Sequence, residues 1–245
     1  MKDEYIRLKE VIDQAHNIVF FGGAGVSTES GIPDFRSEDG LYSMKFKYPP
    51  EMMVSYSFFL THPGEFYDFF RAKLVYPDAL PNNAHYALAR LEQQGKLRAI
   101  VTQNVDNLHQ KAGSVNVLEL HGSGSRYYCM DCGMDSSLEF VLDAKDIPRC
   151  SCGGIIRPDV VLYEESLDQS VIEKSVSAIR GADVLIVGGT SLNVYPAAGL
   201  IRYYQGDKLV LINKSETSYD SYASIVIRDP IGETLAAVVL QGEQG

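Results

Sequence analysis

Short runs of apolar residues recur along the chain and alternate with segments in which apolar residues follow helical spacing. A continuous apolar run bounded by polar residues is typical of a strand that is buried on both faces. Strands of this kind that alternate with helices predict an α/β fold, a parallel sheet with helices on both faces. The predicted strands are 18–21, 97–101, 184–187, 209–212 and 225–227, and the predicted helices are 6–15, Ala84–Gln94, Val171–Ile179, Pro196–Tyr204 and Ile231–Leu240.

Two segments interrupt this alternation. Residues 41–81 are rich in aromatic residues and punctuated by prolines, which predicts a small helical insertion whose rings mostly form core. Residues 123–154 carry every cysteine of the chain and no long apolar run. We predict that the two segments form one small domain on the sheet and leave a cleft where ligands bind. The sheet part then consists of residues 1–40, 82–122 and 155–245, and the whole chain, 1–245, is one catalytic domain.

The cysteines form two closely spaced pairs, Cys129-x2-Cys132 and Cys150-x-Cys152. Each pair can aim both sulfurs at one metal, so together they can close a tetrahedral site around Zn2+. Two disulfides are the alternative, but nothing in the N-terminal sequence exports the chain. Four thiolates leave no open coordination position. We therefore predict one structural zinc per chain, with the chemistry elsewhere.

Composition narrows the class further. The chain has 245 residues, of which 45% are hydrophobic and 22% charged, enough to bury a full core. It starts with polar residues, and no run approaches the roughly 20 apolar residues that cross a bilayer. We expect a cytoplasmic protein without membrane contact. The formal charge of -10 disfavours nucleic acid as a partner, because such binding needs clustered cations.

A glycine-rich loop, residues 22–36, follows the first predicted strand and reads GGAGVSTESGIPDFR. Glycines at this position let backbone N–H groups approach a phosphate closely. The dehydrogenase fingerprint G-x-G-x-x-G does not fit, because Thr28 stands at its third glycine, and the chain has no G-x-x-x-x-G-K-[ST] loop. The loop alone therefore does not identify the ligand.

Several short motifs follow one another along the chain. They are GAGVS at 23–27, GIPDFR at 31–36, TQNVD at 102–106, LHG at 120–122, the paired cysteines, GTSL at 189–192 and LIN at 211–213. These motifs and their order resemble those of the sirtuins, the NAD-dependent protein lysine deacylases. The resemblance extends from about residue 18 to residue 230, and the chain is similar to a minimal bacterial-type catalytic core. It implies a Rossmann-like sheet, NAD as co-substrate and a structural zinc.

The resemblance also implies which residues bind NAD. The pyrophosphate would lie against the glycine loop and the nicotinamide near Phe35, Val105 and Asp106. The implied cofactor-binding residues are Ala24, Gly25, Thr28, Asp34, Phe35, Arg36, Gln103, Val105, Asp106, His121, Thr190, Ser191, Asn213, Lys214 and Asp229.

His121 matches the catalytic histidine of the family, and Asn104 and Asp106 are implied to act with it. In the implied reaction the acyl oxygen of an acylated lysine attacks the nicotinamide ribose as nicotinamide leaves. His121 then helps to deprotonate a ribose hydroxyl, which suits an imidazole whose ordinary pKa is about 6.5. Without the neighbouring motifs, the same histidine would be interpreted as structural, and Asp34, Asn104 and Asp106 as turn, cap or loop residues.

Residues 157–165 resemble the segment with which sirtuins bind an extended substrate peptide, which adds as a strand between this segment and residues 193–195. The implied partners are therefore proteins that carry acylated lysine. Glu164 stands where the family commonly has glycine, which places a carboxylate near the peptide and suggests basic residues beside the acyl-lysine. The implied substrate-binding residues are Val160, Val161, Leu162 and Tyr195.

The acyl group is predicted from the helical insertion. Sirtuins that prefer succinyl or malonyl groups carry a tyrosine and, three residues later, an arginine. An alignment of residues 65–71 places Tyr67 and Phe70 at these positions, and Arg71 is expected to point away from the cavity. We therefore expect acetyl and other uncharged acyl groups, against an apolar wall made by Tyr67 and Phe70.

Two other functions remain open at this point. A mono-ADP-ribosyltransferase would use the same NAD site but place ADP-ribose on protein. A zinc-dependent interaction or nucleic-acid module would use the glycine loop only as a turn.

Overall fold

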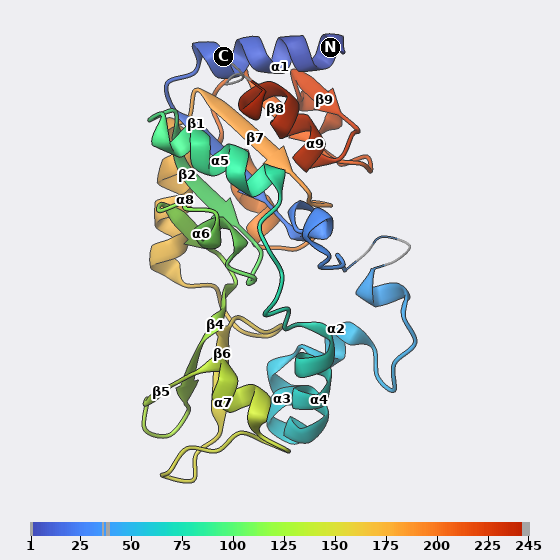
Figure 1. Ribbon diagram of the computed structural model, residues 1–245, viewed down its shortest axis with the longest axis vertical. Helices are drawn as coiled ribbons and strands as arrows, with labels where there is room; N and C mark the ends of the chain where they lie inside the picture. Colours follow the sequence, from blue (N-terminus) through green and yellow to red (C-terminus); the bar gives the residue numbers. More distant parts are fainter. Residues whose placement is uncertain (1, 36, 38–39, 242–245) are drawn as a thin grey trace.

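The computed structural model describes residues 2–35, 37 and 40–241 and shows two bodies, one above the other in Figure 1. The upper body holds a six-stranded parallel sheet of order β3-β2-β1-β7-β8-β9. This sheet confirms the predicted α/β, Rossmann-like class. Its strands are β1 (Ile18–Gly22), β2 (Leu97–Thr102), β3 (Val117–Glu119), β7 (Val184–Gly188), β8 (Leu209–Ile212) and β9 (Ile225–Ile227).

Both faces of the sheet are covered. Along β1, Ile18 and Phe20 belong to one core cluster and Val19 and Phe21 to the other. The continuous apolar run of this strand follows from burial on both sides. The first cluster contains side chains of α1 (Asp3–Gln14), α5 (Asn83–Gln93), α9 (Ile231–Leu235) and η6 (Ala236–Leu240), and the second contains side chains of α8 (Gln169–Gly181) and η4 (Ala197–Tyr203).

Some predicted elements differ from the structure in type or extent. The predicted helix Pro196–Tyr204 is a 3-10 helix, Ala197–Tyr203, and the predicted helix Ile231–Leu240 is a short α-helix followed by a π-helix. Apolar spacing over about ten residues does not distinguish the hydrogen-bond patterns of α-, 3-10 and π-helices. The strand β3 was not predicted at all, because it has only three half-buried residues at the edge of the sheet.

The lower body combines the two segments that interrupt the predicted alternation. Its core contains the aromatic side chains of the helical insertion together with Tyr127, Cys129 and Ile156 of a three-stranded antiparallel sheet. The interpretation of the aromatic residues as core is confirmed. The elements of this body are α2 (Pro50–Met53), α3 (Tyr56–Thr61), α4 (Pro63–Lys73), α7 (Leu138–Asp143), β4 (Gly122–Cys129), β5 (Asp135–Ser136) and β6 (Ile156–Val160).

The division of the chain into two parts at the predicted boundaries stays a proposal. The strand β6, which we assigned to the sheet part, pairs antiparallel with β4: β4 leads into the lower body and β6 leads back toward the upper body in Figure 1. The remaining short helices are α6 (Leu108–Lys111), η1 (Ala24–Val26), η2 (Thr28–Ser30), η3 (Leu41–Ser43) and η5 (Asp220–Tyr222). None of the helices that the structure describes has the length and apolar character that a bilayer crossing requires.

Two histidines are buried under the sheet, where α5 meets α6. Their rings lie 4.8 Å apart between centroids. His85 accepts a hydrogen bond from the Asn82 backbone N–H, which completes the capping box of α5, whereas neither ring nitrogen of His109 has a partner among the described residues. Desolvation lowers the pKa of His85 to about 4 and that of His109 to about 3. Both rings are therefore neutral at pH values near neutrality.

These values predict a stability that depends on pH. Below about pH 6.5 the unfolded chain binds more protons than the folded chain, so stability that is present above this pH is lost as the pH falls toward 4. We expect His109→Leu to lose less unfolding free energy than the wild type between about pH 7 and about pH 5, by on the order of 1 to 2 kcal/mol. Urea unfolding at both pH values measures this difference. A matched His16→Leu variant, altered at an exposed histidine, should keep the wild-type dependence, and equal losses in all three proteins would contradict the prediction.

Candidate active site and metal centre

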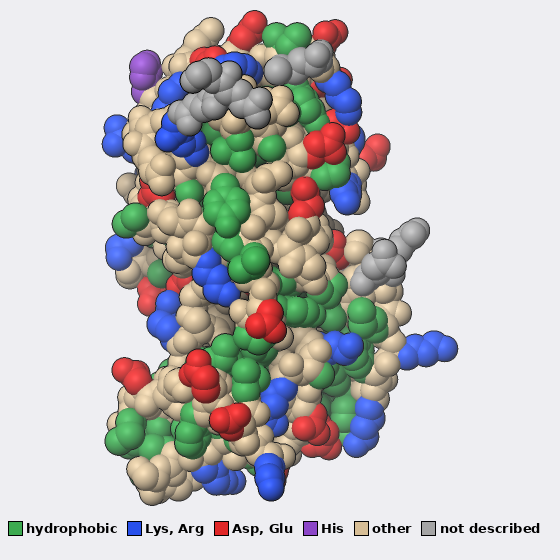
Figure 2. All heavy atoms as spheres, viewed as in Figure 1, with side chains coloured by type: hydrophobic (Ala, Val, Ile, Leu, Met, Phe, Trp, Pro, Cys, Tyr) green, Lys and Arg blue, Asp and Glu red, His purple; other side chains and the backbone are tan. Residues whose placement is uncertain are grey.

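A cleft of about 1390 Å³ lies between the two bodies. Figure 2 shows apolar side chains gathered on this face at the level between the bodies. The cleft exceeds the roughly 300 to 1,000 Å³ of ordinary small-molecule pockets, so it has room for a dinucleotide and part of a peptide. Arg36 lies outside the described residues. The other predicted catalytic, cofactor-binding and substrate-binding residues all line the cleft: Ala24, Gly25, Thr28, Asp34, Phe35, Gln103, Asn104, Val105, Asp106, His121, Val160, Val161, Leu162, Thr190, Ser191, Tyr195, Asn213, Lys214 and Asp229.

The floor of the cleft is a close crossing of two loops. The backbone N–H of Gly25, after β1, donates to the carbonyl of Gly189, after β7, at 2.8 Å. A Cβ atom on Gly25 would lie 2.8 Å from the Gly189 Cα, and Gly189 has a φ of 59°. Real Cβ atoms do not approach so closely, and this φ favours glycine. These glycines are thus needed for the two loops to meet at the carboxyl ends of the strands, where open parallel sheets bind ligands.

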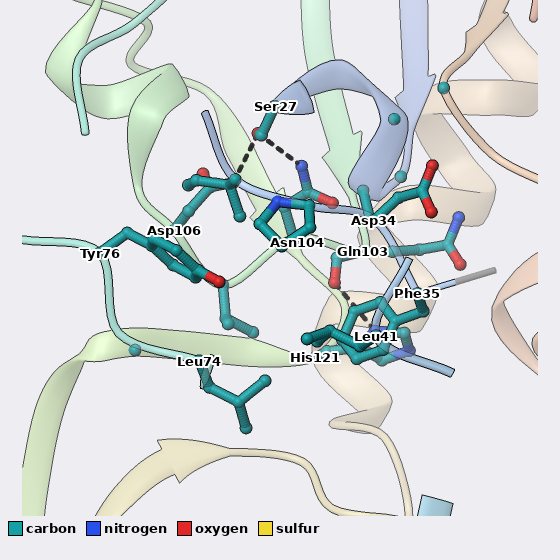
Figure 3. Close-up of a pocket in the computed structure, with 18 of the residues that line it drawn as sticks. Ser27, Asp34, Phe35, Leu41, Leu74, Tyr76, Gln103, Asn104, Asp106 and His121 are labelled. Atoms are coloured by element: carbon teal, nitrogen blue, oxygen red, sulfur yellow. Dashed lines mark hydrogen bonds between the residues drawn. The ribbon is translucent and has the colours of Figure 1, made fainter. Parts of the chain in front are cut away.

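A polar network joins the glycine loop to the loop after β2. Ser27 Oγ donates to Asp106 Oδ2 at 2.6 Å, and Asn104 Nδ2 donates to Ser27 Oγ at 3.1 Å, as the dashed lines in Figure 3 show. Asp106 Oδ1 also accepts from the backbone N–H of Leu108. Sequence reasoning assigned no role to Ser27, although it ends the GAGVS motif. The structure shows that this buried hydroxyl fixes both predicted polar residues.

The loop after β7 is bound to the same region. Gln103 Nε2 donates to Thr190 Oγ1 at 3.1 Å, and the backbone N–H of Leu192 donates to the same oxygen at 3.2 Å. The side chain of Gln103 therefore connects the ends of β2 and β7 across β1. The predicted residues from three separate motifs meet here through direct contacts.

His121 lies at the junction between β3 and β4, and its ring is held by a single backbone contact. Its Nδ1 lies 3.0 Å from the carbonyl oxygen of Gln103. Because a carbonyl can only accept, Nδ1 carries the proton, and Nε2 of the neutral ring keeps a free lone pair. Burial lowers the pKa of His121 from its ordinary value, partly opposed by this hydrogen bond. The ring is therefore prepared to accept a proton near neutral pH.

The residues at the far end of the cleft are partly engaged within the protein. The Asp229 carboxylate accepts from Lys2 Nζ at 2.7 Å and from the Tyr5 hydroxyl at 3.0 Å. Asn213 Nδ2 donates to the Ser215 carbonyl at 2.8 Å. Both residues line the cleft as predicted, but both oxygens of the Asp229 carboxylate already accept from Lys2.

The predicted substrate segment runs along the cleft and is tied to both bodies. The N–H of Val161 donates to the carbonyl of His121 at 3.0 Å, and the N–H of Tyr163 donates to the carbonyl of Val54 at 3.0 Å. Glu165 makes a bidentate pair with Arg157, with both N–O distances 2.8 Å. The backbone that a peptide strand would join is thus fixed in place before any substrate arrives.

Glu164 behaves differently from the expectation. Its φ is 78°, a left-handed conformation that explains why glycine suits this position. Its carboxylate does not extend freely toward a peptide, because it accepts from the backbone N–H of Ser57 at 2.8 Å and from Ser57 Oγ at 2.9 Å. The Glu164 carboxylate instead binds the first turn of α3. The suggested preference for basic residues beside the acyl-lysine therefore loses its basis.

The predicted acyl wall is half right. Phe70 lines the cleft, but Tyr67 does not, because its ring is fully buried and its hydroxyl donates to the carbonyl of Ile156. Phe66 lines the cleft in its place. Arg71 Nε donates to the Val141 carbonyl at 3.1 Å, so its guanidinium points toward α7 and away from the cavity, as predicted.

The four cysteines come together as a metal site. Their sulfur atoms all lie within 4.8 Å of one another, with Cys129 and Cys152 at 3.5 Å and Cys132 and Cys150 at 3.7 Å. These distances exceed the ~2.05 Å of a disulfide. They approach the roughly 3.8 Å edge of a tetrahedron with Zn–S bonds of about 2.3 Å. The donor set fits a zinc ion, and none of the cysteines lines the cleft.

This geometry predicts that the metal supports folding rather than chemistry. Replacing Cys150 with Ser removes one thiolate, and we expect an aggregating or poorly folded protein with less than one zinc per chain. Metal analysis and size-exclusion chromatography measure both effects. Ser151→Ala, at the neighbouring residue, is the matched control and should keep its zinc. A monodisperse, fully active Cys150→Ser protein without zinc would contradict the assignment.

A parallel sheet with a glycine-rich loop and a cleft at the carboxyl ends of its strands defines a dinucleotide-binding α/β protein. Residues 23–196 match the Sir2 family. A NAD-dependent protein deacetylase of Clostridium acetobutylicum is 61% identical over 241 residues, 97% of this chain and 98% of the relative. The chain therefore belongs to the Sir2 family, and the resemblance to sirtuins is confirmed.

Solved structures of the family are similar over nearly the full length. A Sir2 protein with a deacetylated p53 peptide and 3′-O-acetyl-ADP-ribose has a TM-score of 0.89 at 38% identity, covering 99% of both chains. A Sir2 protein with a p53 peptide and NAD+ has a TM-score of 0.86 at 38% identity, again covering 99% of both chains. The two-body arrangement is thus that of Sir2 proteins.

Proposed function

We propose that this protein is an NAD-dependent protein lysine deacetylase that transfers the acyl group of acyl-lysine to ADP-ribose and releases nicotinamide. Membership of the Sir2 family and the relative of that activity at 61% identity support the proposal. The observation that carries it is the neutral His121, whose Nδ1–H is held by Gln103 in a cleft large enough for both substrates. The cytoplasmic location that we expect stays a prediction.

The cleft residues divide into those for the cofactor and those for the peptide. NAD supplies the glycosidic bond to nicotinamide, whose cleavage leaves ADP-ribose as the acceptor of the acyl group. Ala24, Gly25 and Thr28 would hold its phosphates, and Thr190, Ser191 and Asn213 the adenosine half. Phe35 and the residues held by Ser27 would enclose the nicotinamide end. The crossing of the Gly25 and Gly189 loops would bring these NAD-binding residues together on the floor of the cleft.

His121 would act as the general base. Its Nε2 accepts a proton from a ribose hydroxyl, while Nδ1 keeps its own proton on the Gln103 carbonyl. The backbone of His121 is bound in turn to Val161 of the substrate segment. The base and the acyl-lysine would therefore be positioned by two segments that are hydrogen-bonded to each other, which lowers the cost of bringing them together.

The substrate would be an acylated lysine in an extended peptide. Val160, Val161 and Leu162 on one side and Tyr195 on the other line the cleft, and a strand added between them would gain main-chain hydrogen bonds. Binding of this kind depends little on sequence. The acyl chain would enter the apolar part of the cleft beside Phe66 and Phe70.

The proposal predicts the effect of removing the base. We expect His121→Ala to bind NAD and to lose deacetylation by on the order of 100-fold or more, which is the usual contribution of a general base. Incubation with NAD and an acetylated peptide, followed by mass spectrometry of both products, measures the rate. The same assay would reveal ADP-ribosylated protein, the product of the alternative transferase. His16→Ala serves as the control, and near-normal turnover by folded His121→Ala would remove the residue from this role.

The lowered pKa of His121 gives the same assay a pH dependence. The base works in its neutral form, so kcat/KM should fall only as the pH drops below about 6.5, the ordinary value for histidine. A profile that falls already above pH 7 would show that the ring is not desolvated in the way that the structure indicates.

The apolar wall predicts the acyl preference. We expect kcat/KM for acetyl-lysine and butyryl-lysine to exceed that for succinyl-lysine by about tenfold or more, because a buried carboxylate without a partner is costly. One peptide carrying each acyl group in turn provides the comparison. Lys73 is the residue to vary in this comparison, because it is a cation that lines the cleft and could pair with a succinyl carboxylate. A succinyl preference that disappears in Lys73→Gln would show that this lysine reaches the acyl group and that the prediction is wrong.

A further inference from the structure

A tyrosine that lines the cleft is covered by an arginine that is not itself among the lining residues. Tyr195 lines the cleft and is 60% exposed. The guanidinium of Arg202, on η4, lies over this ring at 5.9 Å from its centroid. The nearby hydroxyls of Tyr219 and Tyr195 raise the pKa of Arg202. We call Tyr195, Arg202 and Tyr219 the tyrosine–arginine shelf.

The charge of this shelf is not neutralised within the chain. Arg126, Arg157 and Arg228 each pair with a carboxylate, whereas Arg202 has no ion pair with any residue in the described ranges 2–35, 37 and 40–241. Its contacts are with tyrosines, and its side chain is exposed. An ordered but unpaired guanidinium over an aromatic ring is well suited to pair with a carboxylate from outside, and it keeps its planar donors in position.

The carboxylates near the peptide path have partners of their own. Glu164 is bound to Ser57, Glu165 to Arg157 and Asp159 to Arg126. Of these three, Glu165 and Asp159 each pair with an arginine, whereas Glu164 accepts only from Ser57 and keeps its negative charge. None of the three carboxylates pairs with Arg202.

We propose that Tyr195 and Arg202 form a subsite for an acidic residue that flanks the acylated lysine in the substrate peptide. The inference rests on the proposed function, because it assumes that the peptide runs beside Tyr195. An extended peptide advances about 3.3 Å per residue, so side chains within about three positions of the acyl-lysine can reach the shelf. The Tyr195 ring contacts the stem of the flanking side chain, and Arg202 pairs with its carboxylate.

The expected preference is modest. Exposed ion pairs contribute about 0.2 to 1 kcal/mol, which corresponds to a factor of roughly 1.5 to 5 in kcat/KM. The effect should appear in KM, because the flanking residue does not take part in the reaction. It should also decrease when salt is raised from about 0.1 M to about 1 M, as expected for an exposed pair.

The test compares acetyl-lysine peptides that carry either Asp or Asn at each of the neighbouring positions. The wild type should favour Asp at one or more positions on one side of the lysine. Arg202→Gln should bring the Asp-to-Asn ratio of kcat/KM close to one, and Arg202→Glu should favour Lys over Asn at the same position. Because both peptides are measured on one enzyme sample, a loss of folded protein affects both rates equally.

Arg180 provides the matched control. It lies over the ring of Tyr203 at 5.6 Å, but neither residue lines the cleft. Arg180→Gln should therefore keep the wild-type ratio. A wild-type ratio of one at every position, or an unchanged ratio in Arg202→Gln, would overturn the subsite while deacetylation of the Asn peptides upheld the proposed function. Absence of NAD-dependent turnover of every peptide would overturn the proposed function itself.

Discussion

The contact between Gly25 and Gly189 is the constraint on which the site depends. At this point the loops that leave β1 and β7 pass so closely that a methyl group on either residue would collide with the backbone of the other loop. The contact fixes the position of Ser27 on one side and Thr190 on the other. Ser27 then holds Asn104 and Asp106, and Thr190 holds Gln103. The loop after β2 is therefore oriented by its neighbours as well as by contacts of its own, such as that of Asp106 with the Leu108 N–H.

His121 connects this network of loop contacts to the lower body. Its ring contacts the carbonyl of Gln103, which belongs to the cofactor side, and its carbonyl accepts from Val161, which belongs to the peptide side. Gly122, the next residue, has a φ of 74°, and a Cβ there would lie 2.1 Å from the Asp159 carbonyl oxygen. The chain can thus turn into β4 directly beside β6. The short segment His121–Gly122, together with the Gln103 carbonyl, thus places the base between the two proposed substrates.

The central strands and the glycine loop could be predicted from the sequence because their requirements are local. A strand buried on both faces must be apolar throughout, and a left-handed or crowded backbone needs glycine. The contacts of Ser27, Glu164 and Tyr67 could not be predicted in this way. Each depends on a partner distant in sequence, Asp106, Ser57 and Ile156 respectively. The sequence shows which residue type stands at each of these positions, but it does not show the direction in which the side chain points.

The structure also explains how a metal site outside the cleft can matter for its shape. Cys129 belongs to the same core as Phe66, Phe70 and Tyr127, and the Tyr67 hydroxyl is bound to β6 within that core. Phe66 and Phe70 present their other side to the cleft. Both phenylalanines lie on α4, which packs against Phe59 of α3 and, through Phe70, against Tyr127 of the cysteine-bearing segment. Their position therefore depends in part on that segment being ordered. A zinc ion that orders the two cysteine pairs would therefore stabilise the acyl wall through packing, while the chemistry remains with the residues on the sheet.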